Sequence, residues 1–347
     1  MRYIGSKTAS LPLIERVLTR LGRRYVSLCD PFAGTCTVSR HFKSLGYRIY
    51  TGDVLRQSYV FQVTYIQMNR QPGFTSVIRA IGLQQKNRLH RAHDIVLDYL
   101  NALPGKEGFV TANYSPSGPD LRRFFTSKNA KRIDAVRTQI EEWDRNGLLS
   151  HKEECYLLAC LIEAADRVAN TAGTYYAYLK GLYRKAAKPL RLLPFRIINN
   201  SLRNKAYCQN ARELVRRIEA DILYLDPPYN DREYGAYYHL PETLVLWDSP
   251  EVHGKSGIRT KGIARSSFCR RETATEALWE IVQNAHCKCI LLHYTADGLI
   301  SHRDILAIMQ SRGRTYYTKW YARKYSSFAT DEKADVTGQV LYRCLLN

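Results

Sequence analysis

The sequence lacks long apolar runs. No stretch of its 347 residues approaches the roughly 18 to 20 apolar residues that a transmembrane helix requires. The N-terminal residues MRYIGSKTAS also lack the apolar middle section of a secretory signal peptide. We therefore expect a cytoplasmic protein without a membrane partner.

Cysteine occurs nine times, but not in an arrangement typical of a metal site. Cys287 and Cys289 form a C-x-C pair, and Cys155 and Cys160 lie five residues apart, yet neither pair is joined by a second pair or by histidines at zinc spacing. An odd number of cysteines in a cytosolic chain indicates reduced thiols in the core. We expect that no metal is required.

A glycine-rich dinucleotide motif is missing as well. The segment DPFAGTC, residues 30–36, contains a single glycine, whereas G-x-G-x-x-G needs three, which argues against a nicotinamide-dependent enzyme. Its surroundings still predict a βαβ unit, with strands over 25–29 and 47–51 and a helix over 38–45.

Asp53 ends the second of these strands. It follows Asp30 by 23 residues, close to the spacing of roughly 20 at which an acidic residue can reach a ribose. Two structural alternatives remain: a plain tight turn at 30–35, and a cap by Asp53 on a helix beginning at Val54.

Acidic residues are scarce relative to basic ones. The chain has 52 Lys and Arg against 32 Asp and Glu, a net charge of +20, together with 25 tyrosines. The positive charge is spread along the chain, so it predicts a large basic surface. Basic charge with many aromatic rings suits a phosphate backbone and unstacked bases, and we expect a nucleic-acid partner.

The most informative segment is DILYLDPPYNDREYGAYYHL, residues 221–240. Residues 222–225 are large and apolar, which is typical of a strand buried on both faces. Asp226-Pro227-Pro228-Tyr229 then ends the strand, because neither proline donates a backbone hydrogen bond and both fix φ near about −65°. A carboxylate, carbonyl oxygens and an aromatic ring thus lie at the carboxyl end of a strand, where open parallel sheets bind ligands.

These residue types suit a purine with an exocyclic amino group. The amino hydrogens can be donated to the Asp226 carboxylate and the Pro227 carbonyl, and Tyr229 can stack on the base. An adjacent electrophilic methyl group could then be taken by in-line displacement, helped by orientation and electrostatics. A target within a duplex would have to be flipped out first.

The remaining segments indicate two regions. Helical spacing dominates 71–204, whereas strand patterns occupy the flanks, at 287–298, 314–325 and 338–346. We predict an α/β catalytic domain, 1–70 and 205–347, as a Rossmann-like doubly wound sheet interrupted by a mainly helical insertion, 71–204. The Gly-, Ser- and Arg-rich stretch 251–272 predicts a mobile basic loop.

In the order of its motifs the chain resembles the Dam-like alpha group of adenine-specific DNA methyltransferases, which use S-adenosylmethionine. The resemblance rests on RYIGSK, DPFAG, GFVTANYSP, LIEAADRVANTAGTYYAYLKG, DPPYNDREYGAYYHLPETL, SSFCRR and ARKYSS, which cover nearly the whole chain. It implies a methyltransferase-type sheet, with 71–204 as the DNA target-recognition region.

The resemblance also implies the roles of single residues. Asp226, Pro227, Pro228 and Tyr229 would be catalytic. Cofactor contacts would come from the N-terminal motif, the turn, the ribose acid and an adenine-contacting amide, namely Tyr3, Gly5, Lys7, Asp30, Pro31, Phe32, Ala33, Gly34, Asp53 and Asn210. Lys7 would contact the methionine end and its carboxylate; an ordinary surface lysine is the alternative.

Two positions depart from the pattern of the family. Cys36 stands where a glycine is common, and its side chain limits the backbone conformations that the turn can adopt. Asn210 stands where an aspartate is frequent, which changes a charge-assisted hydrogen bond into a neutral one. Neither change removes a reacting group.

Candidate DNA contacts are basic or aromatic and lie near the recognition and catalytic motifs. They are Arg122, Arg123, Lys128, Lys131, Tyr237 and His239. The four cations could equally form a solvated helix face. We assign His239 a structural or DNA-contacting role rather than that of a general base, since the amino group loses its proton readily after methylation.

The sequence therefore predicts N6 methylation of adenine in double-stranded DNA, with S-adenosylmethionine as cofactor and a restriction endonuclease as a possible counterpart. Methylation of RNA adenine or of cytosine N4 is an alternative, but Asp226 argues against both. A catalytically silent DNA-binding module is a further alternative, which intact Asp226, Tyr229, Gly34 and Asp53 disfavour.

Overall fold

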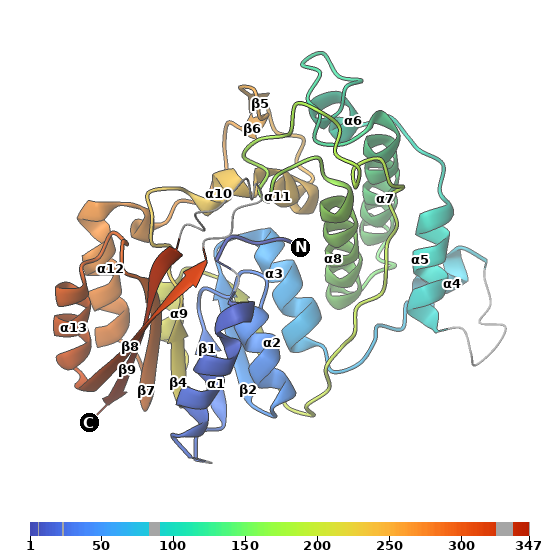
Figure 1. Cartoon of the computed structure of the whole chain (residues 1–347). Coiled ribbons are helices and arrows are strands. Elements are labelled where there is room, and N and C mark those ends of the chain that lie inside the picture. Colours follow the sequence, from blue (N-terminus) through green and yellow to red (C-terminus); the bar gives the residue numbers. More distant parts are fainter. Residues whose placement is uncertain (6, 23, 83–90, 324–335, 347) are drawn as a thin grey trace. The chain divides into compact units, whose positions relative to one another are not determined.

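The chain forms two compact units in a computed structural model that describes residues 1–5, 7–22, 24–82, 91–323 and 336–346 (Figure 1). Unit 1 comprises Met1–Tyr3, Met68–Ile197 and Ala236–Ile263. Unit 2 comprises Ile4–Gln67, Ile198–Gly235 and Ala264–Asn347. The helix-rich unit therefore includes residues 1–3, 68–70 and 236–263 in addition to most of 71–204, whereas residues 198–204 belong to unit 2.

Unit 2 is built on a seven-stranded sheet in the order β3-β2-β1-β4-β7-β9-β8. The five strands β3, β2, β1, β4 and β7 are parallel to one another, whereas β9 is antiparallel to both β7 and β8. The bounds are β1 (Ser27–Asp30), β2 (Arg48–Asp53), β3 (Lys205–Cys208), β4 (Ile222–Leu225), β7 (Cys289–Thr295), β8 (Gly313–Arg323) and β9 (Val336–Leu346). The sheet is mixed and mostly parallel, consistent with the methyltransferase type.

Helices cover both faces of this sheet. On one face α9, α12 and α13 pack against apolar side chains of β4, β7 and β9 to form a buried core. On the other, α2 and α3 lie against β1 and β2 (Figure 1). The bounds in unit 2 are η1 (Thr8–Ser10), α1 (Leu11–Thr19), α2 (Thr37–Ser44), α3 (Arg56–Gln62), the π-helical turn η2 (Val63–Gln67), α9 (Ala211–Val215), η3 (Ser267–Cys269), α12 (Arg271–Gln283) and α13 (His302–Gln310).

The central strands are apolar because both of their faces are covered. All four residues of β4 are buried, and so are all seven of β7. In a parallel sheet between two helical layers, alternate side chains enter opposite cores, so an unbroken apolar run is favoured over alternation. This confirms the predicted strand at 222–225, and the strands expected at 25–29 and 47–51 lie within a few residues of β1 and β2.

Unit 1 is mainly helical. Its elements are α4 (Thr75–Ala80), α5 (Ala92–Ala102), α6 (Phe109–Tyr114), α7 (Ser127–Arg145), α8 (His151–Val168), α11 (His239–Leu246), β5 (Val252–His253) and β6 (Ile258–Arg259), with α10 (Tyr234–Tyr237) spanning the unit boundary. Ser150 and Glu153 form a reciprocal capping box at the start of α8, which satisfies backbone donors that the first helical turn leaves unpaired. Twelve of the eighteen residues of α8 are buried, so it is the central helix of the unit.

The stretch 251–272, expected to be a mobile loop, contains an antiparallel β5–β6 hairpin followed by η3 and the start of α12. Two side chains hold its turn, because the Tyr114 hydroxyl donates to Gly257 O at 2.8 Å and Arg122 Nη2 donates to Gly254 O at 3.0 Å. The loop prediction missed this order since both anchors are distant in sequence. The end of the ARKYSS motif, 324–327, lies outside the described residues.

Candidate active site

Three carboxylates lie where neighbouring strands of unit 2 end. Asp30 ends β1, Asp53 ends β2, and Asp226 directly follows β4. β1 pairs in parallel with β2 on one side and with β4 on the other, so all three residues lie at the same edge of the sheet. Between β1 and β4 the chain changes the direction in which it adds strands, and this is where open α/β sheets bind ligands.

Asp30 is the most enclosed of the three, at 2% exposure. The Ser39 hydroxyl donates to its Oδ2 at 2.6 Å, while Oδ1 has no hydrogen-bond partner in the described part of the chain. Burial raises the pKa of Asp30 to about 7, and the charges of Asp226 and Asp53 add to the rise, against hydrogen bonds from Ser39 and the Phe32 backbone. Oδ1 is thus a buried acceptor ready for a donor or a cation.

The turn after β1 uses left-handed backbone conformations. Gly34 has φ +49° and Cys36 has φ +62°, and Cys36 is fully buried at the start of α2. Glycine adopts this region freely, whereas a side chain there costs about 1 to 2 kcal/mol. This explains physically why a glycine would be favoured at position 36.

Asp53 joins the end of β2 to this turn. Its Oδ2 accepts from Gly34 N at 3.0 Å and its Oδ1 from Leu55 N at 3.0 Å. Burial raises its pKa to about 6, and these two amides oppose the rise. Asp53 does not cap a helix that begins at Val54, because α3 begins at Arg56 and its N-cap residue is Leu55.

Lys7 forms an ion pair with Asp226. Its Nζ lies 2.7 Å from Asp226 Oδ1 and donates to Gly5 O at 2.9 Å, with the two charged side chains only 10% and 20% exposed. Gly5 has φ +78°, so the chain turns sharply just before Lys7. Burial raises the pKa of Asp226, and the charge and hydrogen bond of Lys7 oppose the rise. The surface-lysine alternative is therefore wrong, since Lys7 is buried.

Phe32, in the turn after β1, and His293, on β7, add an aromatic and an imidazole ring to unit 2. The rings of Phe32 and Phe268 meet edge to face at 5.2 Å. His293, on β7, is 1% exposed and lies 3.5 Å from the Tyr224 hydroxyl and 3.1 Å from Gln339 Oε1. Burial, together with the charge of Lys7, lowers the pKa of His293 well below its ordinary value, so this histidine is neutral.

Sequence reasoning missed Phe268 and His293. Phe268 lies in the SSFCRR motif, and His293 interrupts the apolar strand CILLHYT, so a polar residue within a buried strand was the available signal. Glu233 Oε2 accepts from Ser266 N at 2.9 Å, which links the segment after Asp-Pro-Pro-Tyr to η3.

The remaining expected cofactor residues have different surroundings. Asn210 is the N-cap of α9, where its Oδ1 accepts from Arg212 N at 2.9 Å. Tyr3 belongs to unit 1, and its ring stacks on Tyr238 with centroids 4.5 Å apart. Their contacts with a cofactor stay predictions.

The expected DNA contacts in unit 1 divide into exposed and buried residues. Arg123 and Lys128 are exposed, and Lys131 is partly exposed and paired with Glu107 at 2.7 Å. Arg122 is 3% exposed, and its guanidinium contacts Asp120 and the carbonyls of Asn113 and Gly254. Tyr237 is 6% exposed and meets Tyr176 edge to face. Burial of Arg122 and Tyr237 supports structural roles and not direct DNA contact.

His239 is fully buried in unit 1. Its Nε2 lies 2.9 Å from Tyr175 O, and because a carbonyl can only accept, Nε2 carries the proton. Burial lowers its pKa to about 4, with the charges of Arg122 and Arg259 adding to the effect. We expected either a structural or a DNA-contacting role for His239, and these features support the structural one.

Neither a metal site nor a membrane-spanning helix is found among the described residues. No group of three or more His, Cys, Asp or Glu side chains there could hold a metal ion. No helix in that part of the chain is both long and apolar enough to cross a bilayer.

Comparison with known proteins agrees with this geometry. Residues 3–325 match the family described as D12 class N6 adenine-specific DNA methyltransferase. The chain is 36% identical over 346 residues to the type II methyltransferase M.FokI of Planomicrobium okeanokoites, and 34% identical over 348 residues to M.NlaIII of Neisseria lactamica. The modification methylase StsI of Streptococcus sanguinis is 35% identical over 350 residues.

These matches cover 99% of this chain in each case, but different shares of the relatives. They cover 98% of M.NlaIII, whereas the chain spans about half the length of M.FokI and StsI, 52% and 51%. The family match covers most of the chain and includes the edge where Asp30, Asp53 and Asp226 lie. The chain belongs to the D12 class of N6 adenine-specific DNA methyltransferases.

Proposed function

We propose that this chain transfers a methyl group from S-adenosylmethionine to the N6 amino group of a flipped-out adenine in double-stranded DNA. One observation carries the proposal: a partly buried Asp226 carboxylate, paired with Lys7, directly follows β4, the neighbour of β1 in the sheet. Membership of the family indicates the reaction, and the Lys7–Asp226 pair indicates which residues would carry it.

The charges of the edge fit this cofactor. S-adenosylmethionine carries a sulfonium and an ammonium group, and when bound it supplies an electrophilic methyl group. Asp30 Oδ1 is a buried acceptor without a partner in the described chain, and the Asp53 carboxylate is fixed at the same edge by the amides of Gly34 and Leu55. We assign the cationic ligand to Asp30 and the turn, and its ribose to Asp53.

Asp226 would orient the target base. An ionised carboxylate only accepts hydrogen bonds, so Asp226 Oδ2 and the Pro227 carbonyl can take both amino hydrogens of adenine. This directs the nitrogen lone pair away from the ring plane and toward a methyl group held in line. Lys7 helps by keeping Asp226 ionised despite its burial.

Unit 1 would supply contacts to the DNA backbone. Its exposed cations Arg123 and Lys128 suit phosphate contacts, which give affinity without sequence information. We further propose that the chain protects DNA alongside a cognate endonuclease, because one relative is named a modification methylase.

The test is transfer of tritium from labelled S-adenosylmethionine to unmethylated DNA, followed by digestion to nucleosides. The wild type is compared with Asp226→Ala, with Asp226→Asn, which keeps one acceptor oxygen but loses the charge, and with Asp231→Asn as a control at an exposed position. Label in N6-methyldeoxyadenosine that disappears only in the two Asp226 variants supports the proposal. Label in cytosine, label only in RNA, or no label would overturn it.

A further inference from the structure

A cavity of about 730 Å³ lies at the other edge of the sheet in unit 2. Its lining includes the first residues of three strands and the residues just before two others, namely Ser27, Arg48, Lys205, Asp221 and Lys288. Parallel strands begin at one edge of a sheet and end at the opposite one. The three carboxylates of the candidate active site lie where strands end, so this cavity is a separate site.

Asp221, in the lining of the cavity, is already bound by the protein itself. Its Oδ2 accepts from Val26 N at 2.9 Å, Ser27 N at 3.0 Å and Ser27 Oγ at 2.8 Å. Its Oδ1 accepts from Lys288 Nζ at 2.6 Å, and its side chain is 11% exposed. The charges of Asp221 and Lys288 therefore balance each other, and this pair does not set the charge of the cavity.

The remaining charges of the cavity are mostly positive. Arg48, Lys205 and Arg217 line it as exposed side chains. Within the described ranges none of the three forms an ion pair, and Arg217 Nη1 donates to the neutral Gln209 Oε1 at 3.3 Å. Glu219 is the other carboxylate of the lining. Three unpaired cations against one carboxylate leave a net charge of +2, with histidine counted as neutral.

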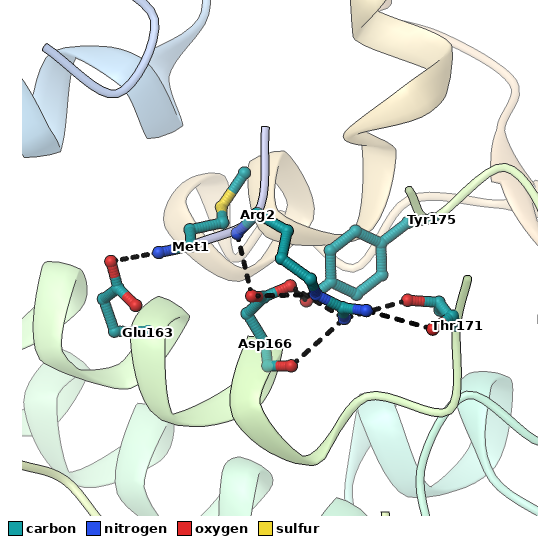
Figure 2. Close-up of polar contacts among 6 residues, drawn as sticks. All are labelled: Met1, Arg2, Glu163, Asp166, Thr171 and Tyr175. Atoms are coloured by element: carbon teal, nitrogen blue, oxygen red, sulfur yellow. Dashed lines mark hydrogen bonds and ion pairs between the residues drawn. The ribbon is translucent and has the colours of Figure 1, made fainter. Parts of the chain in front are cut away.

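Arg2, in unit 1, shows how an arginine that stabilises the fold is held (Figure 2). Its Nε donates to Asp166 Oδ2 at 3.3 Å, its Nη2 to Asp166 Oδ1 at 3.2 Å, and its Nη1 to Thr171 O at 3.0 Å. All three nitrogens of that guanidinium are used by neighbouring residues. The guanidinium of Arg48 has no hydrogen-bond partner in the described part of the chain, so its donors are available to a ligand.

Apolar side chains complete the lining. Tyr50, Ile218 and Cys287 are partly buried and pack against the core of unit 2. A flat ring gains from contact with such side chains, whereas phosphate oxygens suit guanidinium and ammonium groups. The volume of the cavity lies within the roughly 300 to 1,000 Å³ that is typical of small-molecule sites. A ligand with both a ring and phosphates fits this combination.

We propose that this cavity binds a nucleotide, with the phosphates on Arg48, Lys205 and Arg217 and the base against Tyr50 and Ile218. A phosphate monoester carries about 1.5 to 2 negative charges at pH 7, which is close to the opposite charge of the cavity. A DNA duplex is convex, so a recessed site between strand ends favours a small ligand. The inference does not rest on the proposed function, because the site lies at the opposite edge from the residues assigned to methyl transfer.

The first experiment is a calorimetric titration of the full-length protein with ADP, adenosine and inorganic pyrophosphate. ADP should bind about 10-fold or more tightly than either part alone, because it combines charged hydrogen bonds with contact of the base. Its affinity should fall as salt is raised, since exposed charges are screened. Adenosine that binds as tightly as ADP, or no binding of ADP, would overturn the proposal.

Arg216 and Arg217 provide a matched pair of variants. Arg217 lines the cavity, whereas Arg216 pairs with Glu280 at 3.6 Å and is absent from the lining. Arg217→Met should weaken ADP binding by about 5-fold or more, and Arg216→Met should leave it unchanged. Equal losses in the two variants would indicate a general effect of charge and would exclude the site.

Two further variants separate this site from misfolding and from the candidate active site. Glu219→Gln removes a carboxylate from the cavity and should tighten ADP binding by about 2-fold, a gain that an unfolded variant cannot give. Asp53→Asn lies at the other edge of the sheet and should leave the affinity for ADP unchanged. A loss in Asp53→Asn would place ADP at the candidate active site and refute the proposal.

Duplex DNA is the alternative source of phosphate. Added duplex should leave the affinity for ADP unchanged. If Arg48→Met and Arg217→Met weaken duplex binding but leave ADP binding intact, the cavity belongs to a DNA-binding surface and the proposal fails. None of these measurements involves methyl transfer, so an inactive protein would contradict the proposed function and leave this test decisive.

Discussion

Lys7 Nζ and Asp226 Oδ1 lie 2.7 Å apart in unit 2, with their side chains only 10% and 20% exposed. Two such charges stabilise each other because neither is well hydrated, and loss of one leaves the other costly to keep ionised. The pair therefore controls the protonation state of the residue on which the proposed chemistry depends.

Lys7→Met should shift the acidic limb of the single-turnover rate profile to higher pH. The lysine opposes the rise in the Asp226 pKa, so its removal raises that pKa and the active carboxylate forms only at higher pH. We expect a loss of roughly 10-fold or more on the acidic side that lessens as pH rises. Lys7→Arg, which keeps the charge, is the control, and a Lys7→Met profile with the wild-type midpoint would contradict this account.

Binding of S-adenosylmethionine should weaken as pH falls. In the free protein, burial raises the pKa of Asp30 to about 7 and that of Asp53 to about 6. A cationic ligand favours the ionised carboxylates, so binding below these values must release protons. Calorimetry at about pH 5.5 and 7.5 should show roughly 10-fold tighter binding at the higher pH. Asp30→Asn should lose most of this dependence, and equal affinities in the wild type would refute it.

Position 36 should tolerate glycine better than valine. Glycine adopts the φ of +62° without strain, whereas a β-branched residue adopts it with difficulty. Cys36→Val leaves no cavity, so its expected loss of about 2 kcal/mol or more in unfolding free energy reports backbone strain together with the crowding of a larger, β-branched side chain. Denaturant unfolding measures it. Cys36→Gly should unfold nearer to the wild type, and a valine variant as stable as the glycine variant would exclude strain at this turn.

Arg122 and Arg123 are adjacent but should behave in opposite ways. Arg123→Ala removes an exposed cation and should reduce the slope of log affinity for DNA against log salt by about 1, with little change in melting temperature. Arg122→Ala should lower the melting temperature, since it removes buried contacts to Asp120 and the β5–β6 hairpin. The two variants are matched in composition, and a reversed pattern would mean that Arg122 is the DNA contact.

His239→Asn should leave the chemistry intact. With its pKa lowered to about 4 by burial and its Nε2 facing Tyr175 O, His239 is neutral at working pH and directed into the fold. We expect a rate within about threefold of the wild type and an unchanged pH profile, but a lower melting temperature. A general base would cost roughly 10² to 10⁴ in rate, and a loss of that size in a folded variant would assign the role to His239.

The order of helices and strands could largely be predicted from the sequence. Residues 222–225 form β4 as expected, because an unbroken apolar run followed by two prolines permits little else. Asp30, Asp53 and Asp226 also lie at one edge, because parallel strands that precede such turns must end on the same side of their sheet. In both cases the signal is local, or follows from the regular geometry of strands.

The partner of Lys7, the burial of Arg122 and His239, and the hairpin at 252–259 could not be predicted in this way. Each depends on contacts between segments far apart in the chain, and neither spacing nor composition records which segments meet. The division into units has the same origin, since unit 1 combines residues 1–3, 68–197 and 236–263. The sequence by itself determined the family and the strand edge, and it predicted the reacting residues, because motif order and strand chemistry are local. Only the tertiary structure decided which charges are paired and which basic side chains stay exposed, because burial and long-range pairing exist only once the chain has folded.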